Sequence, residues 1–474
     1  MSTRPFWLAG TAATGDTEIT VVNPYTGEDA GKVSVPTVEQ VEEAVAAAHA
    51  VAAEAAALPA HVRADALGHV SRRIGERAEE IARTITAESG KPIKWARAEA
   101  GRAVSVFRWA AEEARRDSGE LQRLDTDPGG TGRMAVVRRV PKGPVLGISP
   151  FNFPLNLVAH KVAPALAVGA PIILKPAPAT PMTALVLGGI IAETDLPGGM
   201  VSVLPMPNDR AASLITDERL PVISFTGGPF GWKLPELAPR KHVTLELGGN
   251  AAAVVLSDAD LDWAARRVAL FGNNQAGQVC IGVQRVIVED SVYDEFVPRL
   301  VERVEALGTG DPADPATDVG PLVEEAAAER VAEWIEEAVT AGAELLTGGT
   351  REGVTVAPTV LADVPADARV VREEVFGPVL VLQRAAGVDA AFAAVNDSDF
   401  GLQAGVFTRD LPTAFRAHRE LEVGGVVIGD VPSFRADQMP YGGVKGSGVG
   451  KEGVRAAMTD LSYERVLVLT GIDL

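Results

Sequence analysis

The sequence predicts an α/β protein with two parallel-sheet αβα units, and three observations support this fold class. The chain has 474 residues, more than one ordinary hydrophobic core accommodates, so two or more domains are expected. Its first third is rich in amphipathic helical patterns. From about residue 142, short β-type runs alternate with helical segments, and a second alternating stretch covers about 252 to 424. Strands that alternate with helices form a parallel sheet flanked by helices.

Three helices are expected in the first third. Thr37-Val-Glu-Gln40 is a capping-box pattern that opens an Ala-rich helix. A second helix has apolar residues at helical spacing from Leu67 to Ile85 and stops at Gly90. A third covers Ala96 to Arg116.

Short β-type runs form the first predicted sheet, with helices between them near 155–169, 180–193 and 209–217. The runs are Val145–Ile148, Pro171–Leu174, Val201–Leu204, Val222–Phe225 and Val243–Leu245. Residues 134–140 and 464–470 look like two amphipathic strands detached from both sheets. Each either pairs across a subunit interface or edges its nearest domain, and the pattern leaves both possibilities open.

Composition narrows the class of partner. There are 44 Lys and Arg against 63 Asp and Glu, a formal net charge of −19, which argues against nucleic acid or an anionic membrane as partner. The N-terminus lacks the apolar run of a signal peptide, and the longest apolar stretch, 162–174, is too short to cross a bilayer. A single cysteine fits a reducing compartment, so a cytoplasmic location is expected.

That cysteine, Cys280, is the most informative residue. It lies among small and amide residues in the segment 271–285, 34 positions after Glu246 in Thr244-Leu-Glu-Leu-Gly-Gly-Asn250. A lone cysteine forms neither an internal disulfide nor a multi-cysteine metal site, and no metal site is predicted. It packs as a small apolar residue or acts as a nucleophile. Small and amide neighbours suit the close approach of a ligand and favour the nucleophile.

Most strands of the first predicted sheet end in a distinctive segment. These segments are Ser149-Pro-Phe-Asn-Phe-Pro154, Lys175-Pro-Ala-Pro178, Thr226-Gly-Gly-Pro229 and Glu246-Leu-Gly-Gly249. Ligands bind at the carboxyl ends of parallel strands, so we expect one shared site. Neither the Gly-x-Gly-x-x-Gly fingerprint nor a Walker phosphate loop is present at the matching positions.

Together with Cys280, this set resembles the aldehyde dehydrogenase superfamily, over essentially the whole chain. Further matches are Glu374–Pro378, Asn396–Leu402 and Pro440–Gly450, and Ser433–Pro440 looks most like members acting on lactaldehyde, succinate semialdehyde and phosphono-aldehydes. The resemblance implies a homodimer or homotetramer with three parts. They are a Rossmann-like cofactor domain (1–122 and 142–248), a catalytic domain (249–446) and a small β oligomerisation element (123–141 and 447–474).

The resemblance also implies a reaction. A Cys280 thiolate attacks the aldehyde, the Asn152 amide and the cysteine N–H stabilise the oxyanion, and Glu246 is the general base that hydrolyses the thioester. Members that transfer the acyl group to coenzyme A lack this carboxylate, so Glu246 favours a free acid product. A coenzyme-A-acylating enzyme and a catalytically silent scaffold are the alternatives. If the family resemblance is set aside, the alternative is that Glu246 forms an ion pair with Lys241 and that Asn152 caps the next helix.

For the cofactor, the resemblance implies NAD or NADP. Lys175 matches the contact to the adenosine ribose, and Glu374 and Phe376 match the contacts to the nicotinamide half. Pro178 stands where many members carry a ribose-binding carboxylate, which removes a repulsion against a 2′-phosphate. If the resemblance is set aside, the alternative is that Lys175 is a solvated charge at a strand end and that Glu374 is a turn residue. The other residues expected to contact cofactor are Ser149, Pro150, Phe151, Ala177, Thr226, Gly227, Gly228 and Leu247.

The resemblance further places Arg102, His160 and Arg435 along the substrate tunnel, where relatives acting on fatty or aromatic aldehydes are apolar. Three potential cations favour a short anionic aldehyde, since arginine binds carboxylate or phosphonate in bidentate fashion. The alternative is that the arginines make structural ion pairs and His160 simply packs. The remaining expected substrate contacts are Phe153, Val279 and Ile281.

Overall fold

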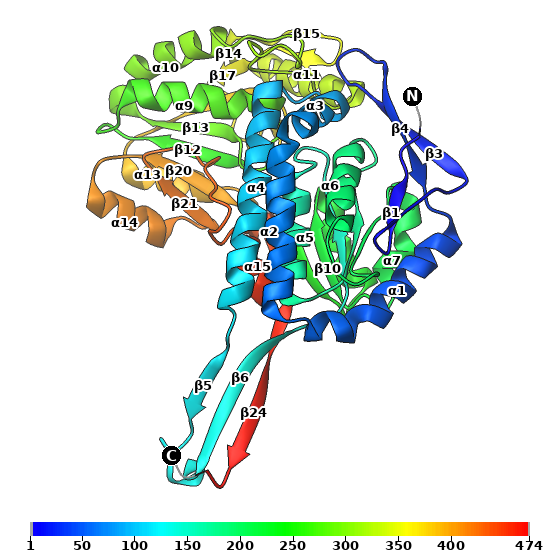
Figure 1. Cartoon of the computed structure of the whole chain (residues 1–474). Coiled ribbons are helices and arrows are strands. Elements are labelled where there is room, and N and C mark those ends of the chain that lie inside the picture. The colour runs from blue at the N-terminus through cyan, green and yellow to red at the C-terminus, as the bar shows by residue number, and fades with distance from the viewer. Residues whose placement is uncertain (1–2, 473–474) are drawn as a thin grey trace.

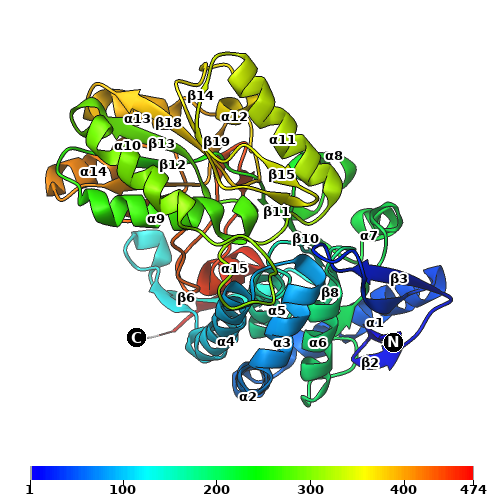
Figure 2. The ribbon, with the colours of Figure 1, turned by 90° about the horizontal axis from the view of Figure 1, so that it is seen from above.

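A computed structural model describes residues 3–472, so the first two and last two residues of the predicted units lie outside it. Two α/β bodies lie side by side, and a narrow arm extends away from them (Figure 1). The view from above separates the two bodies (Figure 2).

The first body contains an eight-stranded sheet in which β7 to β11 run parallel. Antiparallel strands complete both edges. The order is β2 (Thr11–Ala13), β1 (Phe6–Leu8), β9 (Val201–Val203), β8 (Ile172–Lys175), β7 (Val145–Ile148), β10 (Val222–Thr226), β11 (His242–Glu246) and β23 (Gly448–Val449). The hairpin β3 (Thr17–Val22) and β4 (Asp29–Val35) stands apart from it.

Helices with buried apolar faces form the core of this body. The capping box at Thr37 is present, and Gly90 ends α3 with a left-handed backbone. The helix expected over Leu67–Ile85 is two helices, because the backbone bends at Arg77. The helices of this body are α1 (Val38–Ala57), α2 (Ala60–Glu76), α3 (Ala78–Ser89), α4 (Ile93–Arg116), α5 (Asn156–Val168), α6 (Met182–Ala192), α7 (Ala212–Thr216), α8 (Leu234–Leu237) and α15 (Val454–Asp460).

The second body contains a seven-stranded sheet, parallel except for one edge strand, β14. The order is β14 (Glu344–Thr347), β17 (Thr359–Ala362), β18 (Val379–Ala385), β13 (Val283–Glu289), β12 (Ala251–Val255), β20 (Gln403–Phe407) and β21 (Gly425–Ile428). Its helices are α9 (Leu261–Asn273), α10 (Asp290–Glu305), α11 (Glu325–Thr340), α12 (Arg369–Arg372), α13 (Val388–Asn396) and α14 (Leu411–Glu420). Two short pairs are β15 (Arg351–Glu352) with β16 (Thr355–Val356), and β19 (Phe400–Gly401) with β22 (Val444–Lys445).

The arm is a three-stranded antiparallel sheet of β24 (Ser462–Thr470), β6 (Arg133–Pro141) and β5 (Glu120–Arg123). The two detached strands of the sequence therefore pair with each other. Because β23 joins the first sheet, the segment 447–474 contributes to both the body and the arm. The β24 edge exposes the apolar side chains of Val466, Leu467 and Val468, each more than half accessible.

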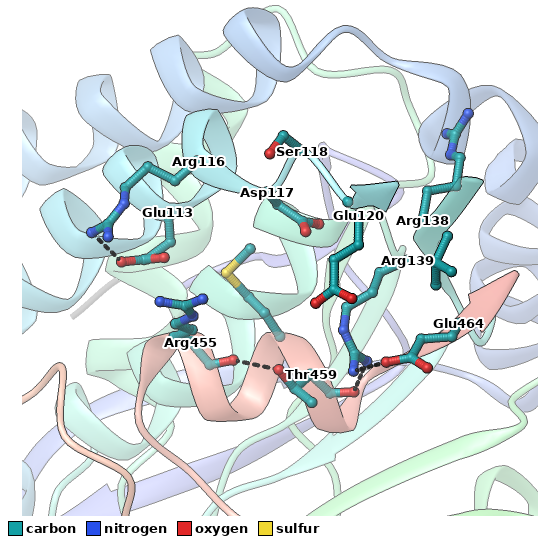
Figure 3. Close-up of a pocket in the computed structure, with 13 residues that line it drawn as sticks. Glu113, Arg116, Asp117, Ser118, Glu120, Arg138, Arg139, Arg455, Thr459 and Glu464 are labelled. Atoms are coloured by element: carbon teal, nitrogen blue, oxygen red, sulfur yellow. Dashed lines mark hydrogen bonds and ion pairs between the residues drawn. The ribbon is translucent and has the colours of Figure 1, made fainter. Parts of the chain in front are cut away.

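A small cavity of about 260 Å³ lies where the arm leaves the body. Figure 3 shows its charged lining from α4, β5, β6, α15 and β24. Arg116 pairs with Glu113 at 3.0 Å, and Arg139 pairs with Glu464 at 2.9 Å. These pairs join the arm strands to each other and brace the end of α4.

Candidate active site

A large cavity of about 1110 Å³ opens at the carboxyl ends of the parallel strands of the first sheet. Cys280 and Asn152 lie on its wall, and Glu374 and Arg330 reach it from the second body. All residues predicted to contact cofactor also line it, and their role there stays a prediction: Ser149, Pro150, Phe151, Lys175, Ala177, Pro178, Thr226, Gly227, Gly228, Leu247, Glu374 and Phe376.

The loop that carries Cys280 has an unusual backbone. Gln275, Ala276 and Gly277 have φ values of 52°, 53° and 69°, in the left-handed region. At Gly277 a side chain would overlap the Gly377 carbonyl, so only glycine fits there. This turn brings Cys280 to the cavity wall, where its Sγ lies 3.3 Å from the Tyr441 hydroxyl. Burial raises the pKa of the Cys280 thiol to about 12, so the resting thiol is protonated.

Asn152 is buried beside this loop, and its Nδ2 donates to the Gln278 carbonyl at 2.9 Å. It does not cap α5, since Glu99 takes that role: Oε1 of Glu99 accepts from the N–H groups of Leu155 at 2.9 Å and Asn156 at 3.0 Å. The second hydrogen of the Asn152 amide group therefore remains for a ligand in the cavity.

The buried Lys91–Glu99 ion pair supports the same segment. The Lys91 Nζ lies 3.8 Å from the centre of the Phe153 ring, next to Asn152. The segment that follows Asn152 is thus held by two charged groups that are themselves buried.

Glu246 ends β11 and is 3% exposed, yet neither carboxyl oxygen has a hydrogen-bond partner among residues 3–472. Burial, and then the Glu452 carboxylate, raise the pKa of the Glu246 carboxyl well above its usual range. The expected alternative pairing with Lys241 is absent, because Lys241 donates to the Leu214 carbonyl at 3.3 Å. Once deprotonated, an unpartnered buried carboxylate is a strong base toward a nearby water.

Lys175 is not a solvated charge, and Glu374 is not merely a turn residue, because both side chains make specific contacts in the large cavity. Lys175 is 2% exposed, and its Nζ donates to Asn208 at 2.5 Å; burial lowers the pKa of its amine to about 8. Oε1 of Glu374 accepts from the Gly249 N–H at 2.9 Å, and burial raises the pKa of its carboxyl to about 7. The rings of Phe151 and Phe376 meet edge to face at 5.9 Å.

None of the predicted substrate residues lines this cavity, and the three potential cations among them belong to a charged cluster in which the Arg102 side chain is 32% exposed. Arg102 pairs with Asp437 at 2.9 Å, and Arg435 pairs with Glu452 at 3.1 Å. The structural ion pairs expected under the alternative interpretation of these two arginines are therefore both present.

His160 changes the expected charge of that cluster. Its Nε2 lies 3.4 Å from the same Asp437 oxygen. Burial, and then the charge of Arg435, lower the pKa of its imidazole to about 4, so His160 is neutral at physiological pH. The expected set of three cations is reduced to two. Of the three apolar candidates, Ile281 packs with Leu402 and Tyr441, Val279 packs against that group, and Phe153 lies under Lys91.

Sequence reasoning missed several residues of this region. Glu452 contacts Lys161 at 3.3 Å and Arg435 at 3.1 Å, and Lys161 also donates to Thr226 at 2.7 Å. Tyr441, which contacts Cys280, lies within the quoted Pro440–Gly450 motif but carried no role there. Its aromatic hydroxyl in a glycine-rich segment was the available signal.

Residues 3–472 contain neither a single helix suited to span a membrane nor a cluster of metal ligands. No single helix there has both the length and the apolarity to cross a bilayer, although α1 and α2 reach that hydropathy together as a pair bent by 115°. No group of three or more His, Cys, Asp and Glu side chains in that range is placed to hold a metal ion.

Comparison with known proteins gives consistent matches. The model of the aldehyde dehydrogenase family matches residues 11–466. A 3-sulfolactaldehyde dehydrogenase of Priestia aryabhattai is 42% identical over 451 residues, covering 95% of this chain and 94% of that protein. A lactaldehyde dehydrogenase of Methanococcus maripaludis is 34% identical, covering 96% and 98%.

Solved structures agree over the whole length. The crystal structure of aldehyde dehydrogenase 21 from Physcomitrella patens, in complex with the reaction product succinate, superposes with a TM-score of 0.98 at 43% identity, covering 100% of this chain and 99% of that one. An NADP-dependent glyceraldehyde-3-phosphate dehydrogenase from Bacillus halodurans, complexed with NADP, has a TM-score of 0.96 at 35% identity, covering 99% and 100%.

Proposed function

Because this chain belongs to the aldehyde dehydrogenase family, we propose that it oxidises a short anionic aldehyde to the free carboxylic acid, with NAD or NADP as hydride acceptor. The observation that carries the proposal is that Cys280 and Asn152 share one cavity with the strand ends of the first sheet. Its buried Lys175, half-buried Glu374 and glycine-bearing loop 226–229 suit a dinucleotide.

The residues divide the reaction between them. The Cys280 thiolate attacks the carbonyl carbon, a C–S bond forms, and the carbonyl electron pair moves to oxygen. The free hydrogen of the Asn152 amide stabilises that oxyanion, a contribution that typically amounts to about 10²–10³ in rate. When bound, NAD or NADP would supply the acceptor for the hydride that leaves the carbonyl carbon, and Cys280 would then carry an acyl thioester. Glu246 then takes a proton from water, the hydroxyl adds to the acyl carbon, and the C–S bond breaks to release the acid.

Glu246 supports hydrolysis rather than transfer to coenzyme A. Its two oxygens have no protein partner within residues 3–472, so they remain for a water molecule. Product analysis with and without added coenzyme A separates the alternatives: free acid in both cases supports the proposal, and an acyl-CoA product overturns it.

The anionic substrate class rests on Arg102 and Arg435. Each guanidinium has five N–H donors and uses one or two of them on its carboxylate, and Nε of Arg435 is buried without a partner in residues 3–472. A buried unpaired guanidinium N–H is costly unless a ligand meets it. The relatives are consistent with such a ligand, since sulfolactaldehyde carries a sulfonate and succinate a second carboxylate.

We also propose that the protein is a homodimer or homotetramer. The β24 edge of the arm exposes Val466, Leu467 and Val468, and an exposed apolar edge strand pairs readily with another chain. Light scattering on a Val468→Lys variant tests this: a smaller particle than the unchanged protein supports pairing through β24, and an unchanged size contradicts it.

The decisive experiment is a panel of short aldehydes assayed with NAD and NADP separately. Succinate semialdehyde, phosphonoacetaldehyde and 3-sulfolactaldehyde should be turned over faster than hexanal. A preference for hexanal would eliminate the anionic substrate class. Stoichiometric alkylation of Cys280 should abolish activity with every aldehyde, whereas a silent scaffold would show no turnover at all. A cytoplasmic location stays a prediction.

A further inference from the structure

The Tyr441 hydroxyl lies 3.3 Å from Sγ of Cys280, within the range of a sulfur hydrogen bond. Its side chain is 4% exposed and packs with Ile281 and Leu402. The Tyr441 backbone exchanges two hydrogen bonds with Glu452, at 3.0 Å and 2.6 Å. The hydroxyl is therefore held in place by both the ring packing and the backbone.

A cation covers the face of the same ring. Cζ of Arg435 lies 3.8 Å from the ring centre of Tyr441, and the same guanidinium pairs with Glu452 at 3.1 Å. A guanidinium over a phenol draws charge from the ring, which makes the hydroxyl a better hydrogen-bond donor. Tyr441, Arg435 and Glu452 thus form one buried unit that ends at the cysteine sulfur.

We propose that Tyr441 is a further catalytic residue, whose hydroxyl donates a hydrogen bond to the Cys280 sulfur and stabilises the thiolate. The proposal rests on the proposed function of Cys280 as nucleophile. Between a neutral thiol and a phenol either atom donates, but a thiolate has no proton, so Tyr441 must be the donor once the sulfur is charged. Hydrogen bonds to ionised groups are stronger than neutral ones, so the contact stabilises the reactive form more than the resting form.

The other groups that face Cys280 explain why such a donor matters. Burial and the carboxylates of Glu374 and Glu246 raise the pKa of the thiol, and Tyr441 and Arg435 oppose them. Tyr441 is the one hydrogen bond among these influences.

Alkylation by iodoacetamide measures this directly, because Cys280 is the only cysteine of the chain. The thiolate forms a C–S bond to the reagent, iodide leaves, and the thiol proton passes to buffer. The rate of mass gain would be followed from pH 6 to pH 11 in the unchanged protein and in Tyr441→Phe. Because the thiol pKa lies near 12, above this range, both rates should rise about tenfold per pH unit, and the variant should react about 10- to 100-fold more slowly at every pH.

Tyr293→Phe is the matched control. Tyr293 is also buried beneath an arginine, with Cζ of Arg384 3.6 Å from its ring centre, but it packs in the core of the second body. Loss of the Tyr293 hydroxyl should leave the alkylation rate of Cys280 unchanged at every pH. A rate ratio that differs severalfold between iodoacetamide and the bulkier N-ethylmaleimide would indicate altered access to the sulfur and overturn the proposal, as would equal rates in Tyr441→Phe and the unchanged protein.

Two further measurements keep the outcomes separate. If Tyr441→Phe fails to fold, as judged by thermal unfolding, Arg435→Lys decides: a smaller loss of the alkylation rate supports the unit, and an unchanged rate contradicts it. Retention of aldehyde oxidation by fully alkylated protein defeats the proposed function itself, whatever Tyr441 does to the thiol.

Discussion

Gly249 lies directly against the carbonyl oxygen of Cys280, so closely that a Cβ atom at residue 249 would overlap it. The N–H of the same glycine donates to Glu374 at 2.9 Å. One residue without a side chain thus holds the nucleophile loop, the Glu374 carboxyl and the strand end of Glu246 at their mutual distances.

Gly249→Ala should therefore lower kcat strongly, with only a small effect on the free energy of unfolding. The added methyl group pushes the Cys280 loop away, and misplacement of reacting groups by about 1 Å costs about 10²-fold in rate. Steady-state kinetics with a good aldehyde would show this. Gly129→Ala is the control, because a Cβ atom there meets nothing within 4 Å. Equal kcat in both variants would show that the close packing at Gly249 is unimportant.

The steady-state rate should rise with pH. Because burial and Glu452 raise the pKa of Glu246, its carboxyl is protonated at low pH, and the basic form that activates water appears only as pH rises through that pKa. Glu246→Gln should lose turnover and accumulate a thioester after one equivalent of reduced cofactor, detectable by mass spectrometry of quenched protein. Turnover by that variant at the unchanged rate excludes Glu246 as the base.

The Lys91–Glu99 pair should matter greatly for stability. Both side chains are at most 1% exposed, and removal of one partner leaves a buried uncompensated charge, which costs about 3–5 kcal/mol. Glu99→Gln should lower the thermal midpoint accordingly. Glu80→Gln breaks the partly exposed pair with Arg77 and should cost less than about 1 kcal/mol. Comparable losses in the two variants would contradict the buried-charge argument.

Arg102→Met should impair anionic aldehydes selectively. We expect about a tenfold higher KM for succinate semialdehyde, the loss of one charge-assisted contact, with little change for hexanal. Arg108→Met, on the same helix but exposed, should leave both values unchanged. If Arg102→Met changed the KM values of both aldehydes equally, the role of Arg102 would be structural rather than in substrate binding.

Pro178→Glu should move the cofactor preference toward NAD. Pro178 lines the same cavity as Lys175, and a carboxylate there would repel a 2′-phosphate. The ratio of kcat/KM for NADP over NAD should fall about tenfold, while Pro178→Gln, similar in size and neutral, should change it less. A ratio that responds equally to both variants would implicate shape rather than charge.

Local patterns predicted much of this fold because they depend on neighbours in the chain. Gly90 ends its helix as expected, and the strand from Val145 has the expected bounds. The break at Arg77 escaped prediction, because neither glycine nor proline marks it and the apolar spacing continues through it. Helix packing, rather than local propensity, decides such a bend.

The partners of charged side chains were beyond local patterns. Arg102 and Asp437 are 335 positions apart, and nothing in either neighbourhood indicates their pairing. The neutral state of His160 likewise follows from burial, which only the folded chain reveals. Residue types at strand ends, by contrast, pointed to one cavity because parallel strands share an edge.

The arm has a consequence for biosynthesis. Its central strand β6 finds β24 only across a long interval, since Arg139 and Glu464 are 325 positions apart. At translation rates of about 5–20 residues per second, β6 waits roughly 15 to 65 seconds on the ribosome with one edge unpaired. Nascent chains stalled before β24 should therefore be the species that chaperones retain and that aggregate when synthesis is interrupted.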